Sequence, residues 1–301
     1  MGKRVQPWSE TKTDNPVELP DDLVDKNVRL LNPLGAPDLY FELYDNAAKR
    51  VTITDPNTGE SENYELVANI NNSETSSHFK VIRNPETGHH VLIGKGMDLV
   101  GRNEGAGRFG GVYKDMLQHD DAENYGCITG QVLDGEKAYL DLLEDSNVKS
   151  IEIIGYSLGS LPASYLASVY GAQITNFADL GVPHTGSEAH LKSQRAMSNN
   201  FNVCSKGYFP GAYGEFKNNL DKNTVGLRLR ADVMAGNFLG NLTGKVGERF
   251  GTQIMLDKDD LNIAGAGHVP QVYADTAKEV HDAPETETVE KLEVDTWKPF
   301  N

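Results

Sequence analysis

The spacing of hydrophobic and polar residues predicts two hairpins in the first third of the chain. Residues 49–70 and 78–96 each alternate apolar and polar positions around a turn, DPNTG in the first segment and NPETG in the second. Alternation interrupted by such turn residues is typical of β-hairpins. The second segment ends in the apolar run VLIG, which predicts a central strand.

Farther along the chain, strand-like and helix-like patterns alternate. Helical spacing is found in residues 130–145, 157–171 and 269–283, and strand-like runs are found in residues 150–155, 173–183, 224–234 and 251–256. Strands that alternate with helices favour a mostly parallel sheet covered by helices on both faces. The predicted fold class is therefore α/β.

We expect a single domain, because the sequence shows no repeat and no linker between two cores. Residues 1–45 are interpreted as an irregular N-terminal arm, residues 46–285 as one α/β domain and residues 286–301 as an acidic, solvated tail. Within the domain, the glycine-rich residues 98–126 form a candidate lid and the polar residues 184–222 a candidate insertion.

The net charge of the chain argues against two classes of binding partner, nucleic acids and anionic membranes. Its 28 basic and 44 acidic residues give a net charge of -16, which argues against nucleic acid, since no basic stripe is present to neutralise phosphates. The charge also argues against electrostatic attraction to anionic membranes, although an apolar patch can still contact a lipid surface transiently. No metal or cofactor pattern is found. Cys127 and Cys204 form either one disulfide or two separate thiols.

The first residues, MGKRVQPWSETKTDNP, lack the apolar core of a secretory signal, and no window is apolar enough to span a bilayer. We therefore expect a protein that is made in soluble form. It would be cytoplasmic, or exported by a route that needs no classical signal peptide.

A serine between two glycines stands where a strand pattern changes into a helix pattern. Gly155-Tyr156-Ser157-Leu158-Gly159 follows the apolar run IEII and precedes an amphipathic segment. This is the context of a nucleophile elbow, in which a strained backbone projects the serine and only glycine fits on either side. The following helix directs its free N–H groups at a developing oxyanion. The alternative is a tight turn with an incidental serine.

A serine nucleophile needs a base, and in chains with this elbow the order is serine, acid, histidine. The histidines after Ser157 are His184, His190, His268 and His281. His268 lies in a small-residue loop before the last predicted helix, where a base can reach the elbow, and it is the predicted base. His184 is the alternative, although a role beside the substrate suits it better.

For the acid, we predict Asp232, because it follows a predicted strand and should emerge at the edge where Ser157 lies. Asp179 lies inside a strand pattern and is the less favoured candidate. The remaining acidic residues of this region, Asp257, Asp259 and Asp260, form a charge cluster typical of a solvated surface.

With these residues assembled, the chain resembles the class 3 (fungal-type) lipases, which have the α/β-hydrolase fold, over roughly residues 79–273. GKGM, residues 94–97, is similar to the family's F-R-G-[ST] motif, with Met97 in place of the hydroxyl residue. The resemblance implies an oxyanion hole formed by the backbone N–H groups of Met97 and Leu158. GYSLGS, NFADLGVPHTGS and RADVMA resemble the family's elbow, T-F-G-x-P-R-x-G and D-x-V-P segments. Bacterial phospholipase A1 enzymes and exported lipase effectors share this general pattern.

The resemblance implies cleavage of carboxylic esters of lipids, but the triad alone does not select the substrate. A general carboxylesterase, a thioesterase or a peptidase would use the same residues, and a non-catalytic binding protein could keep the fold. The candidate lid carries apolar residues, among them Phe109, Val112, Met116 and Leu117, that would contact a lipid surface. The alternative is that these residues pack on the sheet.

Overall fold

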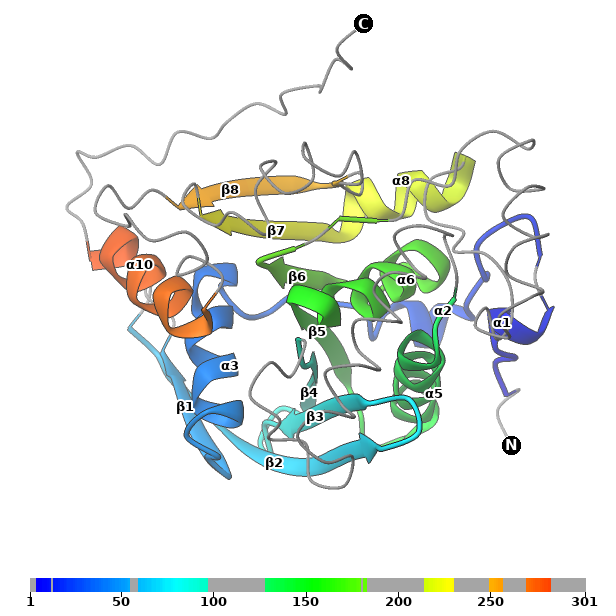
Figure 1. The fold of residues 1–301 in the computed structure, drawn as a ribbon. Helices are drawn as coiled ribbons and strands as arrows, with labels where there is room; N and C mark the ends of the chain where they lie inside the picture. The colour runs from blue at the N-terminus through cyan, green and yellow to red at the C-terminus, as the bar shows by residue number, and fades with distance from the viewer. Residues whose placement is uncertain are drawn as a thin grey trace, which may run out of the picture.

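The structure is a computed structural model. It describes residues 4–11, 13–54, 59–96, 128–179, 181–182, 214–229, 249–256 and 269–282. Within these residues, eight strands form one sheet in which the spatial order equals the order along the chain (Figure 1). The candidate lid and the acidic tail lie outside the described residues, as do Cys127 and Cys204.

The first half of the sheet is antiparallel and the second half is parallel. The antiparallel strands are β1 (Arg50–Thr54), β2 (Ser61–Asn72), β3 (Ser77–Arg83) and β4 (His89–Gly94). The strands that continue from β4 in parallel are β5 (Ser150–Tyr156), β6 (Ile174–Phe177), β7 (Thr224–Leu229) and β8 (Thr252–Leu256). Both predicted hairpins are confirmed, and so is the mostly parallel α/β sheet, since four of the seven strand pairings in the described residues are parallel.

Helices cover both faces of the sheet, which explains the continuous apolar runs of the central strands. Every residue of β4 is buried, as are all residues of β5 except Ser150. One face is packed against α1 (Trp8–Thr11), α5 (Gly130–Glu144), α6 (Ser160–Tyr170) and α8 (Gly214–Asn223). The other face is packed against α3 (Ala36–Tyr44) and α10 (Pro270–Asp282). Figure 1 shows α3 and α10 together on one side of β5 and α5 and α6 on the other.

Local sequence signals explain where the helices flanking β5 begin and end. The hydroxyl of Thr129 caps α5 by accepting a hydrogen bond from the N–H of Val132 at 3.4 Å. Helix α6 ends at Gly171, whose φ of 66° lies in the left-handed region that glycine adopts without a Cβ clash. These boundaries agree with the predicted helices.

The N-terminal segment differs from the irregular arm expected from the sequence. Besides α1, it contains the short elements α2 (Asp21–Val24) and η1 (Pro33–Gly35), and it ends in α3, whose Leu39, Tyr40 and Leu43 are buried in the core. Residues before α3 also contact the amino end of β5: the N–H of Ile151 donates to the carbonyl of Lys26 at 2.7 Å. The segment is therefore part of the domain core.

The candidate insertion 184–222 also needs a correction at its end. Its last residues form most of α8, and Phe216 and Leu220 of that helix are buried against the α6 side of the sheet. The polar composition misled the prediction, because α8 is amphipathic and only its inner face is apolar. Residues 184–213 lie outside the described residues.

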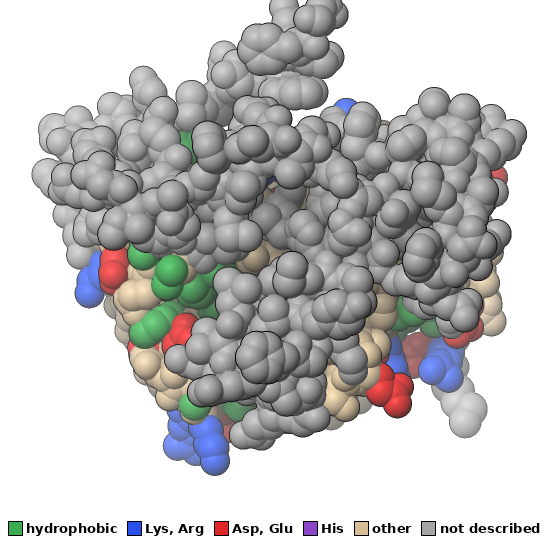
Figure 2. All heavy atoms as spheres, in the orientation of Figure 1, with side chains coloured by type: hydrophobic (Ala, Val, Ile, Leu, Met, Phe, Trp, Pro, Cys, Tyr) green, Lys and Arg blue, Asp and Glu red, His purple; other side chains and the backbone are tan. Residues whose placement is uncertain are grey.

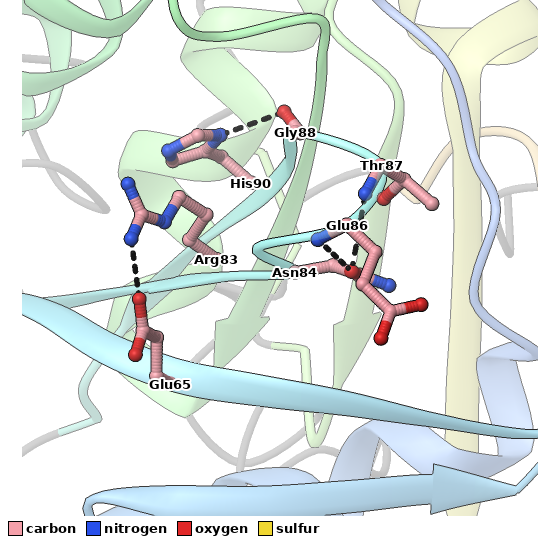
Figure 3. A network of polar contacts seen from close by, with 7 residues as sticks. All are labelled: Glu65, Arg83, Asn84, Glu86, Thr87, Gly88 and His90. Carbon is pink, nitrogen blue, oxygen red and sulfur yellow. Dashed lines mark hydrogen bonds and ion pairs between the residues drawn. The ribbon is translucent and has the colours of Figure 1, made fainter.

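The turn between β3 and β4 is fixed by hydrogen bonds within it (Figure 3). The side-chain oxygen of Asn84 accepts from the N–H groups of Glu86 at 2.9 Å and Thr87 at 3.2 Å, and Gly88 has a φ of 75°. An ion pair between Arg83 and Glu65 joins β3 to β2 beside this turn. The turn therefore fixes the register in which β4 enters the parallel half of the sheet.

Among the helices of the described residues, none is long and apolar enough to cross a membrane.

Candidate active site

Ser157 lies at an abrupt change of direction between β5 and α6. Strand β5 ends at Tyr156, the short helix η2 (Ser157–Gly159) follows, and α6 begins at Ser160. Ser157 has a φ of 49°, a left-handed conformation that a residue with a side chain seldom adopts. Such backbone strain costs roughly 1–3 kcal/mol and is concentrated at functional sites. The strained strand-to-helix turn expected from the motif is therefore present at this serine.

The glycines on either side of Ser157 are required by close backbone packing. A Cβ on Gly155 would lie 2.5 Å from Oδ1 of Asn176 and 2.7 Å from the Cα of Ser160. A Cβ on Gly159 would lie 2.6 Å from the carbonyl carbon of Gly94 and closer still to its oxygen. Contacts this short are not found for real Cβ atoms, so larger residues would displace the turn from the end of β4.

The end of β4 runs directly beside the serine. A Cβ on Gly96 would lie 2.6 Å from the ring of Tyr156 and 3.0 Å from the Cβ of Ser157. Gly96 precedes Met97, the predicted oxyanion residue, which lies outside the described residues. Leu158, the other predicted oxyanion residue, follows Ser157 in η2 and is buried. The backbone leading to Met97 thus lies next to the turn that carries Leu158.

Hydrogen bonds on the inner side hold the turn together. The hydroxyl of Ser160 donates to the carbonyl of Ser157 at 2.5 Å. The side chain of Asn176, on neighbouring β6, donates to the hydroxyl of Ser164 at 3.0 Å. These bonds tie the first turns of α6 to the end of β5 and to β6, so the serine is carried by rigid elements.

The predicted acid and base, Asp232 and His268, both lie outside the described residues, and so does His184, the alternative base. The structure shows the segments that lead to them. Strand β7 ends at Leu229, three residues before Asp232, and runs parallel to β5, so it ends at the same edge of the sheet as Ser157. Helix α10 begins at Pro270, two residues after His268.

Asp179, the less favoured acid, is described and is buried at the end of β6. Its Oδ1 accepts a hydrogen bond from the N–H of Gly181 at 2.8 Å, and its carbonyl accepts one from Arg249 at 3.1 Å. The preceding residue, Ala178, has a φ of 52°. These contacts close a turn at the strand end, which is the role of an aspartate in an Asx-turn.

Two buried tyrosines at this edge were missed in the sequence. The hydroxyl of Tyr40 in α3 accepts the N–H of Gly96 at 3.3 Å, and the hydroxyl of Tyr273 in α10 accepts the N–H of Leu229 at 3.2 Å. Burial raises the pKa of Tyr40 well above its ordinary value, with Tyr44 and Tyr156 adding to the effect, so its hydroxyl keeps its proton. The spacing of Ala36, Leu39, Tyr40 and Leu43 is a helical pattern that could have revealed α3.

Within the described residues, no group of three or more His, Cys, Asp or Glu side chains is arranged to hold a metal ion.

Three comparisons with known proteins were made, and one of them found similar structures. No protein-family model and no curated protein matches the chain. Among solved structures, a mutant form of MDLA from Penicillium cyclopium is 12% identical, with a TM-score of 0.36 over 78% of this chain and 80% of the other. A fungal lipase is 11% identical, with a TM-score of 0.35 over the same shares. Lip2 lipase from Yarrowia lipolytica is 10% identical, with a TM-score of 0.33 over 65% and 66%.

The solved structures found in this comparison are fungal lipases. The α/β class of this chain is shown by its own sheet and helices. At these identities and TM-scores, the likeness gives no information about the chemistry of this chain.

Proposed function

We propose that this chain is a serine hydrolase that cleaves carboxylic esters of lipids through an acyl-enzyme on Ser157. The observation that carries the proposal is the left-handed backbone of Ser157, held between a buried strand and a helix by glycines that no larger residue can replace. A strained backbone at a serine that lies between a buried strand and a helix is the arrangement expected of a nucleophile.

In the proposed mechanism, the hydroxyl of Ser157 attacks the ester carbonyl while His268 accepts its proton and Asp232 orients the imidazole. The N–H groups of Leu158 and Met97 stabilise the oxyanion. As the tetrahedral intermediate collapses, the alcohol leaves with the proton from His268. Water then attacks the acyl-enzyme, with His268 again as base, and releases the carboxylic acid. The described residues supply the serine, Leu158 and the strand end that precedes Met97.

A lipid substrate is proposed because of the apolar content of residues 98–126. In the described part of the chain, the exposed large hydrophobic side chains are spread over separate segments: Val24, Leu30, Val67 and Val269. Figure 2 shows hydrophobic side chains near α10 and α3 with charged groups of both signs around them. Contact with a lipid surface is therefore assigned to the candidate lid.

The nucleophile is tested with Ser157→Ala and a fluorophosphonate label. We expect the wild-type chain to be labelled and to hydrolyse esters, and Ser157→Ala to lose both, with a fall in kcat of about three orders of magnitude or more. Ser168→Ala is the matched control, because Ser168 is a buried serine at the other end of α6. Full activity in Ser157→Ala would refute the role of the serine.

The substrate class is tested with para-nitrophenyl esters of graded chain length and with a phospholipid below and above its aggregation threshold. A lipase should hydrolyse the aggregated phospholipid faster than the monomer, and Phe109→Asp should remove that difference. A preference for short soluble esters, with no change at the threshold, would replace the lipase by a general carboxylesterase or thioesterase. A chain that is neither labelled nor active would be a non-catalytic protein of the same fold.

A further inference from the structure

Two tyrosine hydroxyls hold the backbone at the ends of two different strands beside Ser157. Tyr40 binds the N–H of Gly96, the residue before Met97, and Tyr273 binds the N–H of Leu229, the last residue of β7. The two tyrosines come from α3 and α10, which pack against each other on one face of the sheet. Each hydroxyl therefore reaches the sheet edge from the same helical layer.

The rings of these tyrosines belong to one continuous aromatic layer below the serine. Tyr40 lies 4.8 Å from Tyr156 between ring centroids, and Tyr156 lies 4.9 Å from Phe177. Phe177 in turn lies 5.6 Å from Tyr273. Tyr156 is the residue before Ser157, so the layer connects the backbone of the elbow to both tyrosine hydroxyls. Aromatic contacts of this kind stabilise the packing beyond the area that they bury.

A third tyrosine, Tyr44, holds the same end of β4 by binding a backbone carbonyl in place of a backbone N–H. The hydroxyl of Tyr44 donates to the carbonyl of Ile93 at 2.9 Å and lies 3.2 Å from the carbonyl of His78, and its ring stacks on Tyr40 at 4.6 Å. Two tyrosines of α3 thus hold the chain at the end of β4, Tyr44 through the carbonyl of Ile93 and Tyr40 through the N–H of Gly96, two residues beyond the strand. A backbone held at two points has little freedom to move relative to the serine.

We propose that Tyr40 and Tyr273 are positioning residues for the reaction at Ser157. Tyr40 holds the N–H of Gly96, the residue before Met97, and Tyr273 holds the N–H of Leu229, at the end of the strand that precedes Asp232. This inference rests on the proposed function. Displacement of a catalytic group by about 1 Å can lower a rate by about 100-fold, so loss of one hydroxyl should affect turnover more than substrate binding.

The experiment compares Tyr40→Phe and Tyr273→Phe with Tyr139→Phe. Each change keeps the ring and removes only the hydroxyl. Tyr139 is a matched control, because it is fully buried on the opposite face of the sheet and donates a hydrogen bond to Asn27 at 2.7 Å. Kinetics with a para-nitrophenyl ester and amide hydrogen exchange at Gly96 and Leu229 are measured for all three.

We expect Tyr40→Phe and Tyr273→Phe to lower kcat by about tenfold or more with KM nearly unchanged, because the oxyanion donor and the acid act mainly in the transition state. Exchange should become faster at Gly96 in the first variant and at Leu229 in the second. All three variants should lose a similar amount of thermal stability, because each loses one buried hydroxyl. Tyr139→Phe should leave kcat unchanged, as well as hydrogen exchange at Gly96 and Leu229.

The inference is overturned if kcat falls no more than in Tyr139→Phe, or if exchange at the two amides does not change. Failure of the proposed function looks different: the wild-type chain then hydrolyses no ester and Ser157 takes no label. In that case the exchange measurement still decides whether the hydroxyls hold the two amides.

Discussion

The two ends of strand β5 differ in how their polar side chains, Ser157 and Glu152, are held. At the carboxyl end, Ser157 is presented by a strained turn whose shape depends on glycine contacts and aromatic packing. At the amino end, Glu152 is fully buried, and its Oε2 accepts the N–H groups of Leu30 at 2.9 Å and Leu31 at 3.0 Å. At the carboxyl end, backbone packing thus presents the hydroxyl of Ser157. At the amino end, the carboxylate of Glu152 holds the N-terminal segment through hydrogen bonds.

Burial shifts the pKa values of two side chains near the amino ends of β4 and β5. The Oε1 of Glu152 has no hydrogen-bond partner among the described residues, and burial raises the pKa of this carboxyl to about 7, against the opposing effects of the two amides and Arg29. His89, at the amino end of neighbouring β4, is also buried, and burial lowers its pKa to about 4. The difference teaches that this sheet tolerates strain where chemistry is proposed and buried titratable groups where the chain is held together.

The largest effect is expected at the elbow. Gly159→Ala places a Cβ against the backbone of Gly94, which cannot move without shifting the strand end beside the serine. Overpacking of this kind destabilises a protein by about 1–3 kcal/mol, and displacement of the turn should lower ester hydrolysis about 100-fold or more. Activity and thermal denaturation are compared with Gly35→Ala, where no atom lies within 4 Å of the added Cβ. Wild-type activity in Gly159→Ala would contradict the tight elbow.

The second effect concerns Glu152. Its pKa in the folded state, about 7, lies above the ordinary value of 4.5, so the folded protein binds the proton more tightly than the unfolded chain. The contribution of Glu152 to the free energy of unfolding should therefore fall by about 3 kcal/mol as the pH rises from about 4.5 to 7. Glu152→Gln should remove this fall and be more stable than the wild type above pH 7. Urea denaturation across this range measures the difference, and equal slopes for both proteins would refute it.

An effect of opposite sign and comparable size is expected from His89, which is also fully buried. Its folded pKa of about 4 lies below the ordinary 6.5, so the unfolded chain binds the proton more tightly and stability should rise with pH between about 4 and 6.5. In the wild type this rise offsets the fall caused by Glu152. His89→Gln should therefore expose the fall, and Glu152→Gln should expose the rise. A wild-type curve that both variants reproduce would disprove the offset.

Much of the fold could be predicted from local patterns of hydrophobic, polar and turn residues. Alternation around Pro-Gly turns predicted the two hairpins, and the change from IEII to helical spacing predicted the turn at Ser157. Helix α3 was missed because Pro33, Gly35 and Pro37 punctuate its start and disguise the helical spacing that follows. Proline in the first turn of a helix is compatible with helix formation, so these residues begin the helix and do not break it.

Contacts between distant segments could not be predicted from the pattern. Tyr40 and Gly96 are 56 residues apart, and Glu152 and Leu30 are 122 apart. The sequence shows Glu152 only as a charged residue within an apolar strand. Its buried state depends on two amides that no periodicity places beside it. The same limit applies to Tyr40 and Tyr273, because their hydroxyls reach the backbone N–H groups only when α3 and α10 are packed on the sheet.

On the ribosome, a sheet whose strands pair in chain order can grow one strand at a time. Strands β1 to β4 find their partners soon after they emerge, and β5 needs only β4. The N-terminal segment has to wait, because the N–H of Val17 pairs with the carbonyl of Val169, and Ser9 binds the carboxylate of Glu136. At about 5–20 residues per second, synthesis leaves this segment without its partners for roughly 10 s or more. Nascent chains that stop before α6 is complete would therefore carry a protease-sensitive N-terminus on an already ordered sheet.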